Sequence, residues 1–204
     1  MLDYLRIHSV IKAVLDSVDA KTAHACLFFS TAGAAILQKF YRKNATPIVG
    51  AAFYLLDSKN NKILSFANLA NEEINSSDKA FHAWVKCEDY FIDFMAPMFP
   101  EICLSTDHPF TAPSCMFQKK WEDMIPSIDH FDNLGDFFMI PNADLTIELQ
   151  KSFIELPANI DLVNICLNWY RRHPKKMPSQ FHMQNDLGEI TTIKLKNSSA
   201  SVIL

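Results

Sequence analysis

Apolar residues recur at helical spacing over the first 17 positions, with polar side chains between them. This stripe predicts an amphipathic helix over 2–17. After a polar break, a second helix is predicted over about 23–42, and Thr22 can cap its first turn. The early part of the second helix is rich in alanine, serine and glycine, so neighbouring elements can approach its backbone closely.

Strand-like runs follow these two helices. Apolar segments of strand length, separated by polar turns, lie at 47–56, 62–66, 81–87 and 90–95. A polar loop is expected over 69–78, between the second and third of these strands. Pro97 and Pro100 end the region, because proline cannot donate a backbone hydrogen bond.

The second half of the chain has weaker periodicity. Helical turns are predicted around 116–124 and a helix over 157–172, while 145–154 is ambiguous and a short strand-like run follows 189. No repeat or low-complexity linker divides the chain, so a single domain over 1–204 is expected. The predicted fold class is α+β, with a helix packed on an antiparallel sheet and further helices in the C-terminal half.

Composition limits the cellular setting. The chain has 204 residues, 49% of them hydrophobic, which is enough to form a core without disulfides or a metal. Its five cysteines form no CxxC pair, which favours a reducing compartment. The N-terminus lacks the continuous apolar run of a signal peptide, and no segment reaches the ~20 apolar residues of a membrane span. We expect a cytoplasmic protein that binds no membrane.

The charge pattern argues against a nucleic-acid partner. The net charge is −4, and the densest basic stretch lies at 171–176. Cations there are typical of a helix end, where they complement the helix dipole. Nucleic-acid binding usually needs a wider basic face. The sequence does not indicate an oligomeric state.

Cys26 is the first candidate for chemistry. It lies near the start of the second predicted helix, where unpaired N–H groups carry partial positive charge. That charge favours the thiolate, which is the nucleophilic form, and the same N–H groups can donate to an oxyanion. The alternative is a small core residue, a common role for a cysteine among small side chains.

His82 and Asp93 form the second candidate. If Glu88 and Asp89 make a two-residue turn, cross-strand partners have numbers that sum to 177. His82, Trp84, Asp93 and Met95 then share one face of the hairpin. His82 and Asp93 become diagonal neighbours, close enough for a carboxylate–imidazole hydrogen bond. Such a carboxylate fixes the imidazole tautomer and leaves the other ring nitrogen to face a thiol.

Two alternatives remain open for this hairpin. His82 could be a surface residue, with Asp93 accepting only backbone N–H groups. A longer turn would shift the register and separate the pair, since Glu-Asp is not a favoured two-residue turn.

The order of these elements resembles the transglutaminase-like branch of the papain-like cysteine-peptidase superfamily. In that order a cysteine at a helix start is followed by a histidine on one strand and an aspartate on the next. The matching positions are Cys26, Ala34, Leu37, 45–50, 82–85 and 93–97. Arylamine N-acetyltransferases are similar in the same places, and an uncharacterised bacterial family of unknown function resembles the chain most. The resemblance covers about 20–100.

The resemblance implies a papain-like fold and a Cys26–His82–Asp93 triad. It implies a cysteine-dependent hydrolase or acyl transferase that acts on a peptide, amide or acyl substrate through a thioester, without a cofactor. The loop between His82 and Asp93 is shorter than in transglutaminase-like proteins. No Gln or Asn stands shortly before Cys26, where papain-like peptidases complete their oxyanion hole.

Other residues could complete or replace this site. Thr22 and His24 are candidates to support the oxyanion, and Trp84 could pack beneath the imidazole or be an ordinary core residue. A metal set of His24, Cys26 and His82 lacks the tight paired spacing and fourth ligand of zinc sites, so no metal is expected. A non-catalytic binding module on the same fold is the alternative to an enzyme.

Overall fold

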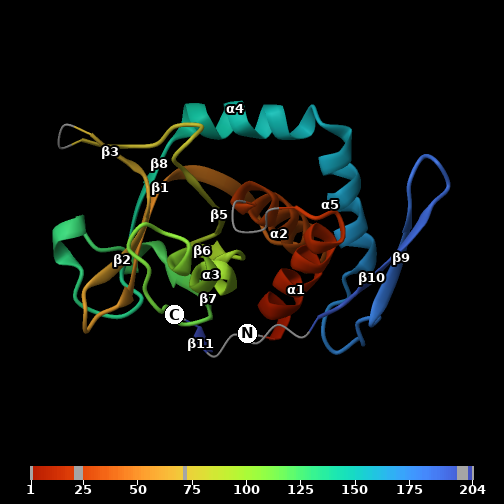
Figure 1. Cartoon of the computed structure of the whole chain (residues 1–204), viewed down its shortest axis with the longest axis horizontal. Helices are drawn as coiled ribbons and strands as arrows, with labels where there is room; N and C mark the ends of the chain where they lie inside the picture. Colours follow the sequence, from red (N-terminus) through yellow and green to blue (C-terminus); the bar gives the residue numbers. More distant parts are fainter. Residues whose placement is uncertain (1, 21–24, 71–72, 197–201, 204) are drawn as a thin grey trace.

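A curled, largely antiparallel sheet and a group of helices lie side by side in the computed structural model (Figure 1). The structure describes residues 2–20, 25–70, 73–196 and 202–203. The helices are α1 (Leu2–Ser17), α2 (Cys26–Tyr41), α3 (Phe99–Leu104), α4 (Ala143–Ile154) and α5 (Pro157–Trp169). No helix in the described ranges is long and apolar enough to cross a membrane.

The main sheet has the order β11-β7-β6-β5-β1-β2, and β8 also pairs with β1. Its strands are β1 (Ala45–Asp57), β2 (Lys62–Phe66), β5 (His82–Cys87), β6 (Tyr90–Asp93), β7 (Cys115–Lys120), β8 (Phe137–Pro141) and β11 (Val202–Ile203). All pairs are antiparallel except β11 with β7. Two further hairpins are β3 (Asn68–Ala70) with β4 (Glu73–Asn75), and β9 (Gln180–Gln184) with β10 (Ile190–Lys194).

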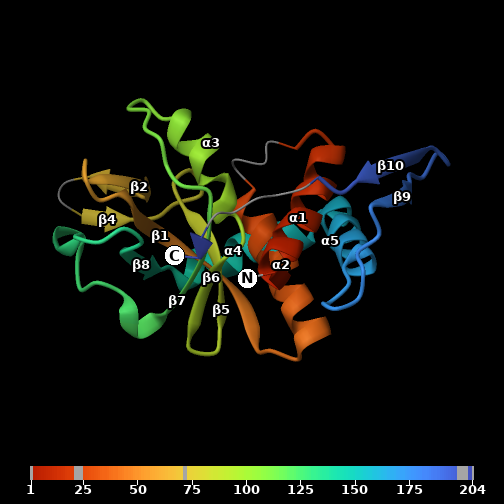
Figure 2. The ribbon, with the colours of Figure 1, turned by 90° about the horizontal axis from the view of Figure 1, so that it is seen from below.

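The helices are arranged around α2. In Figure 1, α1, α2 and α5 lie together beside the sheet, and α4 crosses above β1. Figure 2 shows the β5–β6 hairpin next to the chain that enters β1, and the Glu88 N–H donates to the Asn44 carbonyl across this junction at 3.4 Å. One buried core joins these helices to the sheet.

Two glycines permit close packing near the candidate site. A Cβ added to Gly33 on α2 would lie 2.2 Å from Cδ2 of Phe94, the residue after Asp93. A Cβ added to Gly50 on β1 would lie 2.1 Å from the Ile140 carbonyl oxygen of β8. Gly50 pairs with His82 of β5 on one side and with Pro141 of β8 on the other, so the lack of a side chain there lets β8 approach β1 closely beside His82.

Most predicted elements of the first half are present. The helix over 2–17 is confirmed, the second helix begins at Cys26 rather than 23, and the four strands lie within a few residues of their expected bounds. The coarse α+β class is confirmed. The region 69–78, expected to be a loop, contains the small β3–β4 hairpin.

The helical turns predicted around 116–124 are wrong for most of that segment. Residues Cys115–Lys120 form β7, and only Trp121–Asp123 form a short 3-10 turn. The reason is tertiary: β6 has an edge that β5 leaves unpaired, and β7 satisfies its backbone groups over Tyr90–Asp93. Strand pairing outweighs local helical propensity here.

Candidate functional site

The β5–β6 hairpin has the register that places His82 and Asp93 together. Val85 pairs with Ile92 and Cys87 with Tyr90, so the turn consists of Glu88 and Asp89 alone. Glu88 has φ of 56°, the left-handed conformation that tight hairpin turns require. The predicted two-residue turn is therefore confirmed, although glutamate rarely adopts this conformation.

His82 and Asp93 form a buried ion pair. His82 Nε2 lies 2.6 Å from Asp93 Oδ2, and both residues have 0% of their surface exposed. A buried carboxylate needs strong partners because water no longer solvates it. The diagonal contact expected from strand parity is present, and the alternative of a surface histidine does not apply.

Two further donors hold the Asp93 carboxylate. Tyr54 Oη donates to Oδ2 at 2.8 Å, and the Met95 backbone N–H donates to Oδ1 at 2.8 Å. Tyr54 comes from the centre of β1, four residues beyond the glycine that faces His82. Sequence reasoning missed Tyr54. A tyrosine within a fully apolar strand was the available signal, because a buried hydroxyl needs a polar partner.

Aromatic rings enclose the His82 imidazole. Phe66 stacks on it with ring centroids 4.3 Å apart, and Tyr54 meets it edge-on at 5.8 Å. Phe99 lies 6.0 Å away at a tilt. This packing restricts the ring's rotation and excludes water from the side of the ion pair.

Cys26 is the first residue of α2 and is 5% exposed. The preceding Ala25 provides no side-chain cap, and the first helical hydrogen bond runs from the Phe29 N–H to the Ala25 carbonyl. The N–H groups of the first helical residues therefore have no helical acceptor. Because Cys26 is the first residue of α2, its thiol lies near the positive end of the helix dipole.

The environment of His82 favours its charged form. Burial opposes protonation, but the Asp93 carboxylate, and after it the Cys26 thiol, raise the pKa of His82 to about 9. Nε2 is engaged with Asp93, which leaves Nδ1 for the thiol. Nδ1 is buried and makes no hydrogen bond of regular geometry within the described residues. The Cys26 thiol is thus near enough to raise the pKa of the ring, although Nδ1 has no hydrogen-bond partner among the described residues.

Of the three other predicted site residues, the structure describes only Trp84. Thr22 and His24 lie outside the described residues. Trp84 is fully buried, packs against Phe91 at 6.2 Å, and its Nε1 has no partner in the described part of the chain. The residues that the structure describes contain no group of three or more His, Cys, Asp or Glu that could hold a metal.

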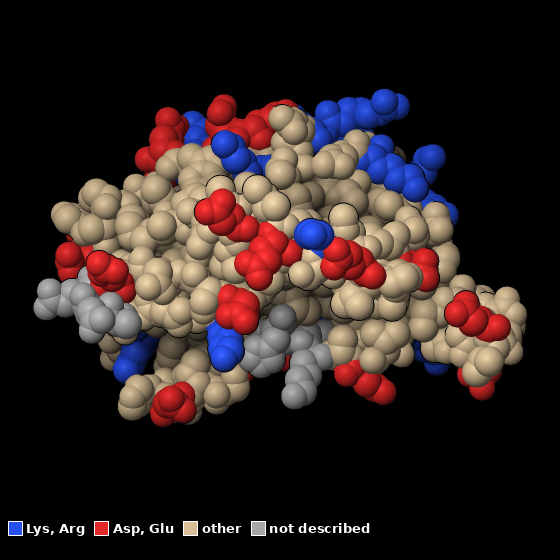
Figure 3. All heavy atoms as spheres, turned by 90° about the horizontal axis from the view of Figure 1, so that it is seen from above, with Lys and Arg blue, Asp and Glu red and all other residues tan. Residues whose placement is uncertain are grey.

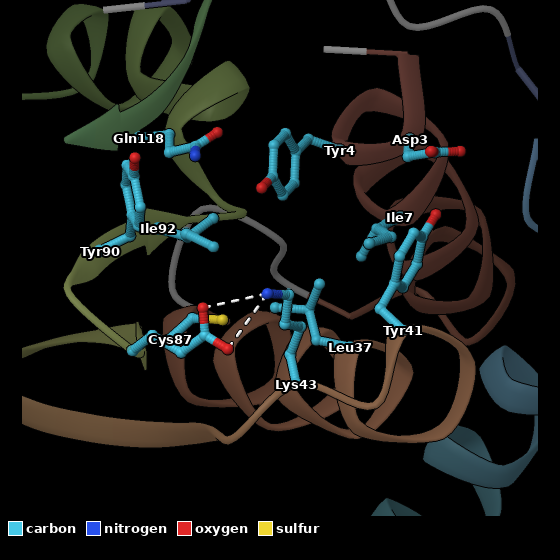
Figure 4. A pocket seen from close by; sticks show the side chains of 11 residues that line it. Asp3, Tyr4, Ile7, Leu37, Tyr41, Lys43, Cys87, Tyr90, Ile92 and Gln118 are labelled. Atoms are coloured by element: carbon cyan, nitrogen blue, oxygen red, sulfur yellow. Dashed lines mark hydrogen bonds and ion pairs between the residues drawn. The ribbon is translucent and has the colours of Figure 1, made fainter. Parts of the chain in front are cut away.

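A separate cavity of about 340 Å³ lies at the far end of β5, where α1, α2 and β6 meet (Figure 4). Cys87, the last residue of β5, lines it beside the ion pair of Lys43 with Glu88. Burial, followed by the charge of Glu88, raises the pKa of the Cys87 thiol. Cys87 and His82 stand at opposite ends of the strand, so this cavity is distinct from the ion pair.

Charged side chains do not form a broad basic surface on the face seen from the side of α4. Figure 3 shows acidic side chains spread over that face, the largest groups of Lys and Arg side chains at one edge, and other Lys and Arg side chains scattered elsewhere. A local cavity of about 510 Å³ is lined by Arg171, Arg172 and Lys175. The basic stretch is thus a local feature beyond the end of α5.

Comparisons with known proteins extend over nearly the whole chain. A family model described as "Protein of unknown function (DUF2026)" matches residues 1–202. A solved structure described as "The crystal structure of genomics APC5867" is similar with a TM-score of 0.88 and 32% sequence identity, covering 100% of this chain and 95% of that chain. No curated protein matches the chain. Neither description names an activity or a substrate.

Proposed function

The chain belongs to the DUF2026 family of proteins of unknown function, and from the geometry of its buried site we propose that it is a cysteine-dependent hydrolase or acyl transferase. Its substrate would be a peptide, amide or other acyl compound, and the reaction would pass through a thioester on Cys26. The supporting observation is the His82–Asp93 pair, 2.6 Å apart and fully buried beside a cysteine that begins a helix.

The charges suit nucleophilic catalysis. The pKa of His82 is raised to about 9, with Asp93 and Cys26 outweighing burial, so the ring is protonated at neutral pH. An imidazolium beside the thiol stabilises a thiolate, as does the N-terminus of α2. Asp93 keeps the proton on Nε2 and orients the ring, because its carboxylate can only accept there.

In the first step the Cys26 thiolate attacks the substrate carbonyl carbon. The new C–S bond forms while the carbonyl π electrons move to oxygen, and backbone N–H groups at the start of α2 can donate to that oxyanion. When the C–N or C–O bond breaks, the leaving group takes the proton from His82 Nδ1. Water or another acceptor then attacks the thioester, gives its proton to His82 and releases Cys26.

The same arrangement supports placement in the papain-like or transglutaminase-like superfamily, through the order of Cys26, His82 and Asp93 on a helix and two strands. Peptidase, amidase, deamidase and acyltransferase reactions share these steps. We propose the general chemistry and leave the acceptor open. The cytoplasmic location and the lack of nucleic-acid partners stay predictions.

One observation favours a second candidate, a non-catalytic binding module. Cys26 is only 5% exposed and His82 and Asp93 are 0% exposed, so a substrate has little direct access in this conformation. In that case the buried pair would serve stability alone, and Cys26 would form no adduct with an acyl donor.

Acyl-enzyme trapping distinguishes these functions. The wild type and Cys26→Ala are incubated with a panel of activated acyl and amide donors, and intact masses are recorded. We expect an acyl adduct on the wild type that peptide mapping places at Cys26 and that Cys26→Ala lacks. Cys87→Ala is the matched control, because Cys87 is also a buried core residue and its exposed fraction, 6%, is close to the 5% of Cys26. Adducts unchanged in Cys26→Ala, or no adduct across the panel, would contradict the proposal.

A further inference from the structure

A second buried histidine contacts the backbone beside Asp93. His8 on α1 is 1% exposed, and its Nδ1 lies 2.8 Å from the Phe94 carbonyl oxygen. A carbonyl only accepts hydrogen bonds, so Nδ1 carries the proton and donates it. The contact joins residues 86 positions apart, so it ties α1 to the end of β6.

The Phe94 carbonyl and the Met95 N–H belong to the same peptide group. That N–H donates to Asp93 Oδ1 at 2.8 Å, while the carbonyl at the other end accepts from His8 at 2.8 Å. Because a peptide group is rigid and planar, fixing its carbonyl also fixes the direction of its N–H. Hydrogen bonds in such a chain also polarise one another.

We propose that His8 is a positioning residue for the His82–Asp93 pair. It acts through the 94–95 peptide group: the His8 proton holds the carbonyl, the Met95 N–H holds Asp93 Oδ1, and Oδ2 is thereby aimed at His82 Nε2. The catalytic significance of this relay rests on the proposed function, whereas the relay itself is a property of the fold.

The surroundings of His8 keep it a donor at neutral pH. Its ring stacks on Phe29, one turn after Cys26 on α2, with centroids 5.4 Å apart and planes at 12°. Burial lowers the pKa of His8 to about 4, so the ring is neutral at neutral pH. Lys12 and Asp16, which pair with each other at 2.9 Å, and Asp93 act on its charge. Glu101 and Lys196 line the same cavity as His8, and Lys196 also pairs with Asp16 at 3.3 Å.

Three substitutions separate donation from packing. His8→Asn keeps a donor, because its Nδ2 branches from Cγ as Nδ1 does. His8→Gln moves the donor one bond further out, and His8→Leu removes it. Ser9→Ala is the control on α1, since the Ser9 hydroxyl only donates to the Leu5 carbonyl within the helix. The readout is the pKa of His82 by NMR titration, which requires no substrate.

We expect His8→Leu and His8→Gln to lower the pKa of His82 by about one unit, a tenfold change in proton affinity. His8→Asn and Ser9→Ala should stay at the wild-type value. If His8→Leu does not fold, the comparison of His8→Asn with His8→Gln decides. An unchanged His82 pKa in the folded donor-deficient variants, or an equal fall in His8→Asn, would overturn the proposal.

Acyl trapping at Cys26 keeps this test apart from the proposed function. If His8→Leu shifts the His82 pKa while the wild type forms no acyl adduct, the relay stands and the catalytic proposal fails. If the adduct forms at Cys26 at the same rate in every His8 variant and the His82 pKa is constant, the catalytic proposal stands and His8 has no positioning role.

Discussion

Replacing Asp93 with asparagine removes one charge from the buried pair with little change in shape. In the wild type, burial disfavours the charged His82 ring, yet its pKa is raised to about 9 from 6.5, chiefly by Asp93. That rise corresponds to about 3 kcal/mol in favour of the charged ring. Asp93 and, after it, Cys26 together contribute more than this amount, because they also offset the burial of a ring that is 0% exposed.

In Asp93→Asn the burial of His82 loses the Asp93 carboxylate, the largest of the contributions that raise its pKa, so we expect that pKa to fall below 6.5. The oxygen of the new amide must stay on the Met95 N–H, because an NH₂ group cannot accept that hydrogen bond. The NH₂ group therefore takes the place of Oδ2 and faces His82 Nε2. Nε2 then becomes an acceptor and the ring proton moves to Nδ1, the nitrogen needed by Cys26. Turnover should fall by about a hundredfold or more.

The assay is an NMR titration of the His82 ring, with turnover of an acyl donor measured in parallel. Asp89→Asn is the matched control, because Asp89 is an exposed acid in the turn of the same hairpin. We expect that control to keep a wild-type His82 pKa. A pKa in Asp93→Asn within half a unit of the wild type would refute the reasoning that Asp93 keeps the ring charged.

Three further outcomes are expected. Tyr54→Phe removes the 2.8 Å donor that shares Asp93 Oδ2 with His82. More of the charge on that oxygen then acts on the ring, so the His82 pKa should rise further, and the unfolding free energy should fall by about 1–2 kcal/mol in urea melts. Gly33→Ala places a Cβ 2.2 Å from the buried Phe94 ring and should lower that free energy by about 1–3 kcal/mol. Burial lowers the pKa of His8 to about 4, so between pH 6.5 and 4 the unfolded chain binds a proton at His8 that the folded chain does not. The unfolding free energy of the wild type should therefore fall by about 3 kcal/mol over this range, and His8→Asn should lack this part of the fall. An unchanged unfolding free energy in Tyr54→Phe or Gly33→Ala would contradict the first two predictions, and equal acid sensitivity of His8→Asn and the wild type would contradict the third.

The candidate pair could be predicted because a hairpin follows simple rules. Residue alternation and a two-residue turn at Glu88 and Asp89 determine which side chains are diagonal neighbours, and the observed register agrees. The start of α2 was less certain, and the sequence prediction placed Cys26 one turn inside the helix. In the structure Cys26 is its first residue, which gives the thiol fuller access to the helix dipole.

Contacts between distant elements could not be predicted from the same patterns. Tyr54 and His8 reach the pair from β1 and α1. A tyrosine within an apolar strand indicates that its hydroxyl needs a polar partner, but neither the strand pattern nor the helix pattern reveals which distant residue is that partner. The segment Cys115–Lys120 becomes a strand only because β6 offers an unpaired edge. Long-range pairing of this kind leaves no local signal in the amino-acid order.

The central claim is that Cys26 is the activated thiol of this fold, and competitive alkylation tests it most directly. Native protein is treated with limiting iodoacetamide at pH 7, and peptide mapping follows the rate at Cys26 and at Cys87, which are 5% and 6% exposed. Similar burial makes their surroundings the main difference. We predict that Cys26 reacts first and that His82→Ala slows Cys26 at least tenfold without affecting Cys87. Faster reaction at Cys87, or a Cys26 rate indifferent to His82→Ala, would contradict the claim.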